Sequence, residues 1–225
     1  MDGLTRRGKP LTGDRQIAMK DWNKSYRESE GRLFGAEPVE YLREVLARSD
    51  VSPGSALCLA DGDGRNGTWL AGQGLTVTAV DGSDVATEMA NAHDSAAGVS
   101  VERIAADLAE WTIAEYRVWD LVTVFYLQCE EPVRRRALSM GAAALSPGGW
   151  MVAEGFGGSH IVDGAPGPKA GDLRYDLESI RSALPGLTII EAMEGVIRLN
   201  EGLRHQGVAP VVRVLARKDE AAVSP

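Results

Sequence analysis

The stretch LCLADGDGRNG, residues 57–67, decides the fold of this 225-residue chain. It begins with apolar residues that predict a buried strand, and Gly62, Gly64 and Gly67 then follow with the spacing G-x-G-x-x-G. Glycines between a strand and a helix allow the backbone to approach a ligand at the helix N-terminus. The pattern therefore predicts a strand–loop–helix unit that binds a nucleotide-like cofactor.

Outward from this loop, apolar runs alternate with segments of helical character. Such an alternation predicts an α/β fold, with a mostly parallel, doubly wound sheet covered by helices on both faces. The run SPGG at 146–149 is expected to separate a helix from the strand that follows it. Strands are predicted at 55–60, 75–80, 99–105, 119–125, 150–153, 187–191 and 211–216, and helices at 64–72, 84–97 and 131–145.

One domain is expected over residues 19–219, made of a helical cap at 19–50 and a Rossmann-like core at 51–219. Residues 1–18 are polar and lack periodicity, so they are predicted to be a disordered tail, as are residues 220–225. Residues 157–172 are rich in glycine and proline. A loop of this length is more often functional than a simple connection.

The composition excludes several classes of protein. The net charge of −8 argues against nucleic acid as a partner, because phosphate binding needs clustered basic residues. No apolar run is long enough to span a membrane, and the N-terminus lacks the apolar core of a signal peptide. Cys58 and Cys129 lie in or next to apolar runs, which favours free thiols over a disulfide or a metal site. We expect a cytoplasmic protein, monomeric or homodimeric, without a metal.

The charges in the glycine loop distinguish between two cofactors. A dinucleotide would place its pyrophosphate against Asp61 and Asp63, at a cost of about 3 kcal/mol for each pair of like charges near 5 Å. S-adenosylmethionine (SAM) carries a sulfonium and an ammonium group, which the same carboxylates would attract. The loop therefore favours SAM, with Asp61, Gly62, Asp63, Gly64 and Arg65 as its first contacts.

Two further carboxylates follow predicted strands. Asp81 ends the strand after the glycine loop, where a carboxylate can accept hydrogen bonds from both ribose hydroxyls; the alternative is a helix N-cap or turn residue. Asp107 follows the next strand and is predicted to accept a hydrogen bond from the adenine amine, with a surface turn as the alternative. Their neighbours are expected to complete the cofactor site: Gly82, Ser83, Leu108 and, at the end of a later strand, Phe125.

These motifs together resemble the class I SAM-dependent methyltransferases. The resemblance rests on residues 56–66, 77–81, Asp107, 119–122 and the 145–149 break, and it extends over roughly residues 20–218. The continuation Gly64-Arg65-Asn66, the pair Phe34-Gly35 and the segments 201–207 and 211–218 are similar to the bacterial TehB-like branch, the tellurite-resistance and thiol methyltransferases.

The resemblance implies a seven-stranded sheet that ends in an antiparallel hairpin, with SAM lying across the carboxyl ends of the first two strands. It also implies S-adenosylhomocysteine (SAH) as the product and, within the TehB-like branch, a thiol or another chalcogen as the acceptor. The class usually has an acidic residue where this chain has Cys58 and a glycine where it has Ala60. Asp61 is expected to replace that acidic residue as the partner of the SAM ammonium group.

The methyl acceptor is expected beside the fourth predicted strand and the late loops. Methyl transfer mainly requires alignment of the nucleophile, and a hydroxyl nucleophile also needs a base. His205 and Tyr126 are therefore the candidate catalytic residues. The candidate acceptor-binding residues are Trp22, Tyr26, Phe34, Gln128, His160 and Arg204.

Alternatives to a small-molecule thiol methyltransferase remain open at this point. Methylation of an oxygen or nitrogen atom of a metabolite is the close alternative. An NAD(P)-dependent oxidoreductase is disfavoured by the acidic glycine loop. A non-catalytic SAM-binding protein has the same binding motifs as an enzyme, so the sequence does not separate the two.

Overall fold

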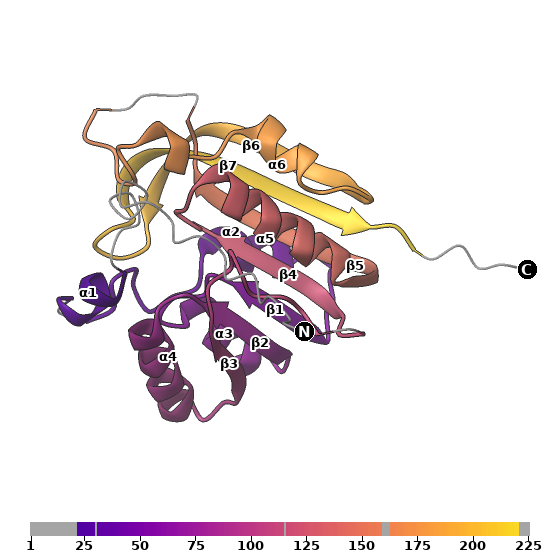
Figure 1. Ribbon diagram of the computed structural model, residues 1–225, viewed down its shortest axis with the longest axis horizontal. Helices are drawn as coiled ribbons and strands as arrows, with labels where there is room; N and C mark the ends of the chain where they lie inside the picture. The colour runs from indigo at the N-terminus through magenta and orange to yellow at the C-terminus, as the bar shows by residue number, and fades with distance from the viewer. Residues whose placement is uncertain (1–21, 30, 115, 159–162, 221–225) are drawn as a thin grey trace, which may run out of the picture.

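A computed structural model describes residues 22–29, 31–114, 116–158 and 163–220, and the predicted tail at 1–18 lies outside these ranges. A seven-stranded sheet in the order β3-β2-β1-β4-β5-β7-β6 forms the centre of the fold (Figure 1). Its strands are β1 Ser55–Leu59, β2 Thr76–Asp81, β3 Val101–Ala105, β4 Trp119–Phe125, β5 Leu145–Phe156, β6 Leu187–Asn200 and β7 Gln206–Lys218. Its helices are α1 Trp22–Arg27, α2 Glu40–Leu46, α3 Arg65–Gly72, α4 Asp84–Ala97, α5 Glu131–Ala143, the 3-10 turn η1 Gly171–Leu173 and α6 Leu177–Ser182.

Strands β1 to β5 are parallel, and β7 pairs antiparallel with both β5 and β6. This arrangement confirms the predicted doubly wound sheet and its C-terminal antiparallel hairpin. None of the helices in the described ranges is both long and apolar enough to cross a membrane.

Successive side chains of β1 point to opposite faces of the sheet, so this strand contributes to both layers of the core. Leu57 and Leu59 face the side covered by α5 and α6, whereas Ala56 and Cys58 face the side covered by α2 and α3. All four side chains are at most 1% exposed. Because both faces of this strand are buried, its sequence is apolar without interruption.

The structure corrects three details of the predicted elements. The run at 146–149 bulges within β5 rather than preceding it. Trp119 pairs with Leu145 and Leu121 pairs with Trp150, so Asp120 alone lies opposite four residues, three more than in a regular ladder. The hairpin strands β6 and β7 are far longer than the predicted runs at 187–191 and 211–216. Helix α6 was not predicted at all.

Candidate functional site

The glycine loop lies between β1 and α3 and is shaped by residues with left-handed backbone conformations. Gly62 has a φ of 57° and Gly64 a φ of 88°, which only glycine adopts without strain. A Cβ atom on Gly64 would lie 2.7 Å from the Arg103 guanidinium and 2.8 Å from the Ala90 Cβ. Ala60 has a φ of 61°, so alanine occupies a conformation that favours the glycine usual at this position.

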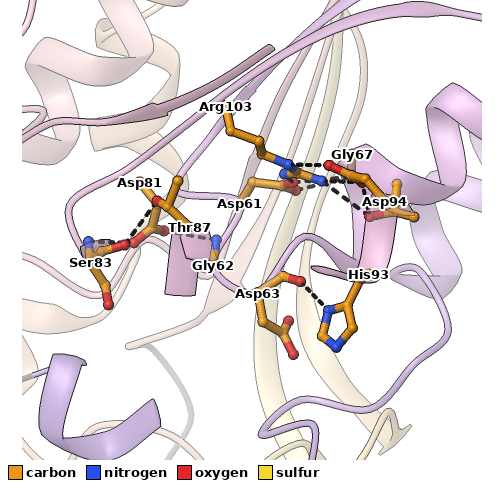
Figure 2. A network of polar contacts seen from close by, with 11 residues as sticks. Asp61, Gly62, Asp63, Gly67, Asp81, Ser83, Thr87, His93, Asp94 and Arg103 are labelled. Carbon is orange, nitrogen blue, oxygen red and sulfur yellow. Dashed lines mark hydrogen bonds and ion pairs between the residues drawn. The ribbon is translucent and has the colours of Figure 1, made fainter. Parts of the chain in front are cut away.

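The two loop carboxylates have different environments (Figure 2). Asp61 is buried and turns toward Arg103, whose Nη1 donates to Asp61 Oδ2 at 2.5 Å. The Gly67 amide also donates to Asp61, at 3.1 Å. Burial raises the pKa of Asp61 to about 6, although Arg103 and the Gly67 amide both act to lower it. The partners of Asp61 are thus internal, which disfavours the predicted pairing of Asp61 with the SAM ammonium group.

Arg103 joins three elements around this carboxylate. It extends from β3 and also donates to both carboxylate oxygens of Asp94 on α4, each at 2.9 Å. Its Nη2 contacts Thr68 Oγ1 of α3 at 3.1 Å. We call Asp61, Thr68, Asp94 and Arg103 the Arg103 cluster. It fixes the glycine loop against the neighbouring helices, and no local sequence pattern indicates it.

Asp63 differs from Asp61 in its hydrogen bonding. The residue is 1% exposed, and its Oδ2 has no hydrogen-bond donor among the described residues. Arg32 approaches this oxygen at 3.8 Å, too far for a hydrogen bond. The loop backbone is positioned from α4, where His93 Nδ1 lies 2.9 Å from the Asp63 carbonyl oxygen. A buried carboxylate oxygen without a donor fits a cationic ligand such as an ammonium group.

Asp81, at the end of β2, accepts hydrogen bonds from two backbone amides. The Gly62 amide donates to its Oδ2 and the Ser83 amide to its Oδ1, both at 2.8 Å. Ser83 itself caps α4, because the Ala86 amide donates to Ser83 Oγ at 3.0 Å. Asp81 is therefore not the N-cap of that helix. Each of its oxygens retains a second lone pair, which fits the two hydroxyls of a ribose.

The other residues predicted to contact the cofactor differ in exposure. Gly82 and Asp107 are exposed, and Asp107 Oδ1 accepts a hydrogen bond from the Ala109 amide at 2.8 Å in the turn after β3. Leu108 is buried in the core cluster on the α5 side. Phe125 is buried in the opposite core cluster, so its ring packs within the domain.

Arg65 connects the glycine loop to the cap and to the C-terminal hairpin. Its Nη1 donates to the Phe34 carbonyl oxygen at 2.9 Å, and its Nη2 donates to Glu201 Oε2 at 3.0 Å. Beside it the chain segments touch: a Cβ on Gly202 would lie 2.3 Å from the Gly35 nitrogen. The segments at 34–35 and 201–207, singled out in the sequence, are thus neighbours in space. The Arg65 side chain joins the two segments, because it donates a hydrogen bond to each of them.

An aromatic cluster extends from α1 to the hairpin turn. Trp22, Tyr26 and Phe34 contact one another with ring centroids 6.1–6.4 Å apart. Phe34 lies 4.8 Å from the His205 ring. The Tyr26 hydroxyl lies over Gly62, 2.4 Å from where a Cβ would be. Tyr26 therefore covers the glycine loop. It was predicted to bind the methyl acceptor, but it is not among the residues that line the cavity described below.

The His205 ring is buried between this aromatic cluster and the end of β4. It is 1% exposed, and its Nε2 has no partner among the described residues. Its Nδ1 lies 3.4 Å from Arg65 Nη2 and 3.7 Å from Glu201 Oε2. Burial lowers the pKa of His205, and Arg65 lowers it further, against the opposing effect of Glu201. The ring is thus neutral at pH 7.

Tyr126 does not present its hydroxyl to a ligand. The hydroxyl donates to the buried carboxylate of Glu154 on β5, which is also bonded to Arg213 Nε at 2.5 Å. Burial raises the pKa of Tyr126 well above its ordinary value, and Glu154 adds to that effect. The centroid of its ring lies 4.0 Å from the centroid of the His205 ring. The geometry contradicts a reactive role for Tyr126 and leaves it a packing partner of His205.

A cavity of about 630 Å³ lies beside His205, between α1, the 164–173 segment and the hairpin turn. Figure 1 shows these three parts gathered at one end of the molecule. The predicted acceptor residues Trp22, Phe34, Gln128 and Arg204 line it together with His205. His160 lies outside the described residues. Phe156, Lys169 and Leu173 also line the cavity and were not predicted.

The fold and this site define a class: a Rossmann-like α/β domain with a cofactor loop at the carboxyl edge of its parallel strands. Residues 56–149 match the family described as "Methyltransferase domain". Over these residues the chain is similar to methyltransferases, and its sheet has the Rossmann-like methyltransferase fold. A comparison with curated protein sequences finds no match.

Several solved structures share this fold. One, described by the conversion of a disulfide bond into a thioacetal group during echinomycin biosynthesis, has a TM-score of 0.67 and 20% identity, and the match covers 90% of this chain and 92% of that one. TehB from Haemophilus influenzae has a TM-score of 0.64 and 17% identity over 78% of this chain and 61% of that one. The N-methyltransferase NodS from Bradyrhizobium japonicum WM9, in complex with SAH, has a TM-score of 0.62 and 17% identity over 89% of this chain and all of the other.

Proposed function

We propose that this enzyme methylates a small molecule bound in the cavity beside His205, while Asp63 and Asp81 hold the cofactor. The observation that carries this proposal is a pair of buried polar atoms that have no hydrogen-bond partner among the described residues: Asp63 Oδ2 in the cofactor loop, and Nε2 of His205, a residue that lines the cavity. Buried polar atoms are normally satisfied, and those left over mark places where a ligand completes the structure. When bound, SAM supplies an electrophilic methyl group on a sulfonium.

In this arrangement Asp63 pairs with the ammonium group of the cofactor and Asp81 accepts hydrogen bonds from its ribose. Tyr26 and α1 cover the glycine loop and exclude water from it. Trp22, Phe34 and Gln128 position the acceptor, and His205 Nε2 accepts the proton that a hydroxyl or thiol releases on methylation. Tyr126 keeps the His205 ring in place through its 4.0 Å contact.

The class of the acceptor atom follows from the need for a base. A thiol has a pKa near 8.5 and is partly ionised at neutral pH, so it depends little on His205. A hydroxyl depends on it strongly. The neutral, buried imidazole supports an acceptor that loses a proton, and methylation of oxygen is then the first candidate. Methylation of a thiol or another chalcogen nucleophile, suggested by the TehB-like segments, is the second.

Replacing His205 by alanine is expected to lower kcat by about 10²–10⁴-fold with a hydroxyl acceptor and much less with a thiol acceptor, at nearly unchanged SAM affinity. Turnover with phenolic, thiol, selenite and tellurite acceptors, measured beside calorimetric SAM binding, tests this. Glu178→Ala is the control, because Glu178 is exposed on α6 and does not line the cavity. Undiminished turnover of every accepted compound in His205→Ala would refute the proposed role of this ring.

SAM affinity is expected to fall in a titration from pH 8 toward acid pH. Burial raises the pKa of both Asp63 and Asp81 above the ordinary value. The cationic cofactor binds their ionised forms, so protonation in the free protein competes with binding, and affinity is lost as pH falls through the raised pKa values. Asp63→Asn should weaken binding about tenfold at pH 8 and flatten part of this pH dependence.

Calorimetry across this pH range measures the effect, with Asp84→Asn as the control on an exposed carboxylate of α4. A pH profile for Asp63→Asn identical to that of the wild type would show that Asp63 does not face the cofactor.

A further inference from the structure

The cavity beside His205 has the opposite charge to the molecule as a whole. The chain has a net charge of −8. The charged residues among the described lining of the cavity are Lys169 and Arg204, both basic, and this lining contains no aspartate or glutamate. Local positive charge in an acidic protein concentrates anions at that point of the surface.

Neither cation has a partner among the described residues. Lys169 and Arg204 are exposed, and neither forms a hydrogen bond or an ion pair with another described residue. Arg65 differs from these two residues, because its guanidinium already donates hydrogen bonds to the Phe34 carbonyl oxygen and to Glu201. The two basic side chains at the cavity are therefore available to an anionic group of a ligand.

The remaining lining suits a flat apolar body. Trp22, Phe34 and Phe156 line the same cavity, and the ring centroids of Phe34 and Phe156 lie 4.8 and 5.3 Å from that of His205. Aromatic walls with a few convergent polar groups are typical of sites for small aromatic ligands. His205 also lines this cavity, and its buried Nε2 has no hydrogen-bond partner among the described residues.

We propose that the methyl acceptor is an aromatic small molecule that carries a carboxylate or a comparable anionic group. Its ring packs among Trp22, Phe34 and Phe156, its anionic group pairs with Lys169 and Arg204, and its nucleophilic hydroxyl or thiol contacts His205 Nε2. This inference rests on the proposed function, because it assigns a ligand class to the same cavity.

The test is calorimetry with 3-hydroxybenzoate and its neutral analogue 3-hydroxybenzamide, titrated into protein already saturated with SAH. We expect the carboxylate to bind about tenfold more tightly than the amide, and added salt to reduce this preference. The double variant Lys169→Gln/Arg204→Gln should bind both compounds equally. Arg181→Gln, which removes an exposed cation from α6, should retain the wild-type preference.

The preceding SAH titration separates the two proposals. Failure of SAH to bind would overturn the proposed function itself. If SAH binds, three results would overturn the anionic acceptor alone: equal affinity for the two compounds, no detectable binding of 3-hydroxybenzoate, or a carboxylate preference that survives in the double variant.

Discussion

Replacing Asp81 by alanine is expected to weaken SAM binding by about 3 kcal/mol, roughly a hundredfold, because hydrogen bonds to a charged group contribute about 1.5–3 kcal/mol each. The carboxylate already orients the Gly62 and Ser83 amides at 2.8 Å, so it is fixed in place before the ligand arrives. Such preorganisation lowers the cost of ordering the site on binding. Asp81→Asn should lose less, since it keeps one acceptor oxygen.

Asp120 offers a matched control for this experiment. It too is a carboxylate on a parallel strand, but it lies near the amino end of β4, whereas Asp81 lies at the carboxyl end of β2. There the Gly54 and Ser55 amides donate to Asp120 Oδ2 at 3.0 Å. Asp120→Asn should cost stability and leave SAM affinity unchanged. Calorimetry together with thermal unfolding separates the two effects. Wild-type SAM affinity in a folded Asp81→Ala protein would assign Asp81 to the turn alone.

Replacing Arg103 by methionine is expected to lower the free energy of unfolding by about 3–5 kcal/mol, because it leaves two buried carboxylates without their cation. Arg103, Asp61 and Asp94 have side chains that are only 4, 2 and 7% exposed. Adding Asp61→Asn and Asp94→Asn should recover part of the loss, since the uncompensated charges are then removed. Denaturant unfolding measures both changes.

The pH dependence of the stability loss in Arg103→Met shows whether buried charge causes that loss. Burial raises the pKa of Asp61 to about 6 even with Arg103 present, above the value near 3.9 of an unfolded chain. A carboxyl group whose folded pKa is raised takes up its proton first in the folded state, so it costs stability as pH rises. The deficit of Arg103→Met should therefore be larger at pH 8 than at pH 5.

Arg117→Met is the control. The side chains of Arg117 and its ion-pair partner Glu102 are 39% and 50% exposed, so this ion pair should contribute under about 1 kcal/mol to the free energy of unfolding. A deficit in Arg103→Met that is equally small, or independent of pH, would show that lost packing rather than buried charge governs this site.

The sequence by itself determined the sheet and the location of the cofactor loop. Apolar runs such as 119–125 coincide with observed strands because both faces of a parallel strand are buried, which leaves a continuous local signal. The glycines at 62 and 64 are likewise local, since their positive φ angles require the residue type. The long hairpin was underestimated because β6 is an edge strand with little burial, so its sequence is mixed.

Only the tertiary structure decided which polar side chains are free to meet a ligand. Asp61 and Asp63 are equivalent in sequence, yet Arg103, 42 residues from Asp61 along the chain, pairs with the first and leaves the second open. Tyr126 and His205 were equal candidates, yet Glu154 on the neighbouring strand binds the tyrosine hydroxyl and no described group binds His205 Nε2. Partners distant in sequence leave no local pattern, because they meet only when the strands pair and the helices pack.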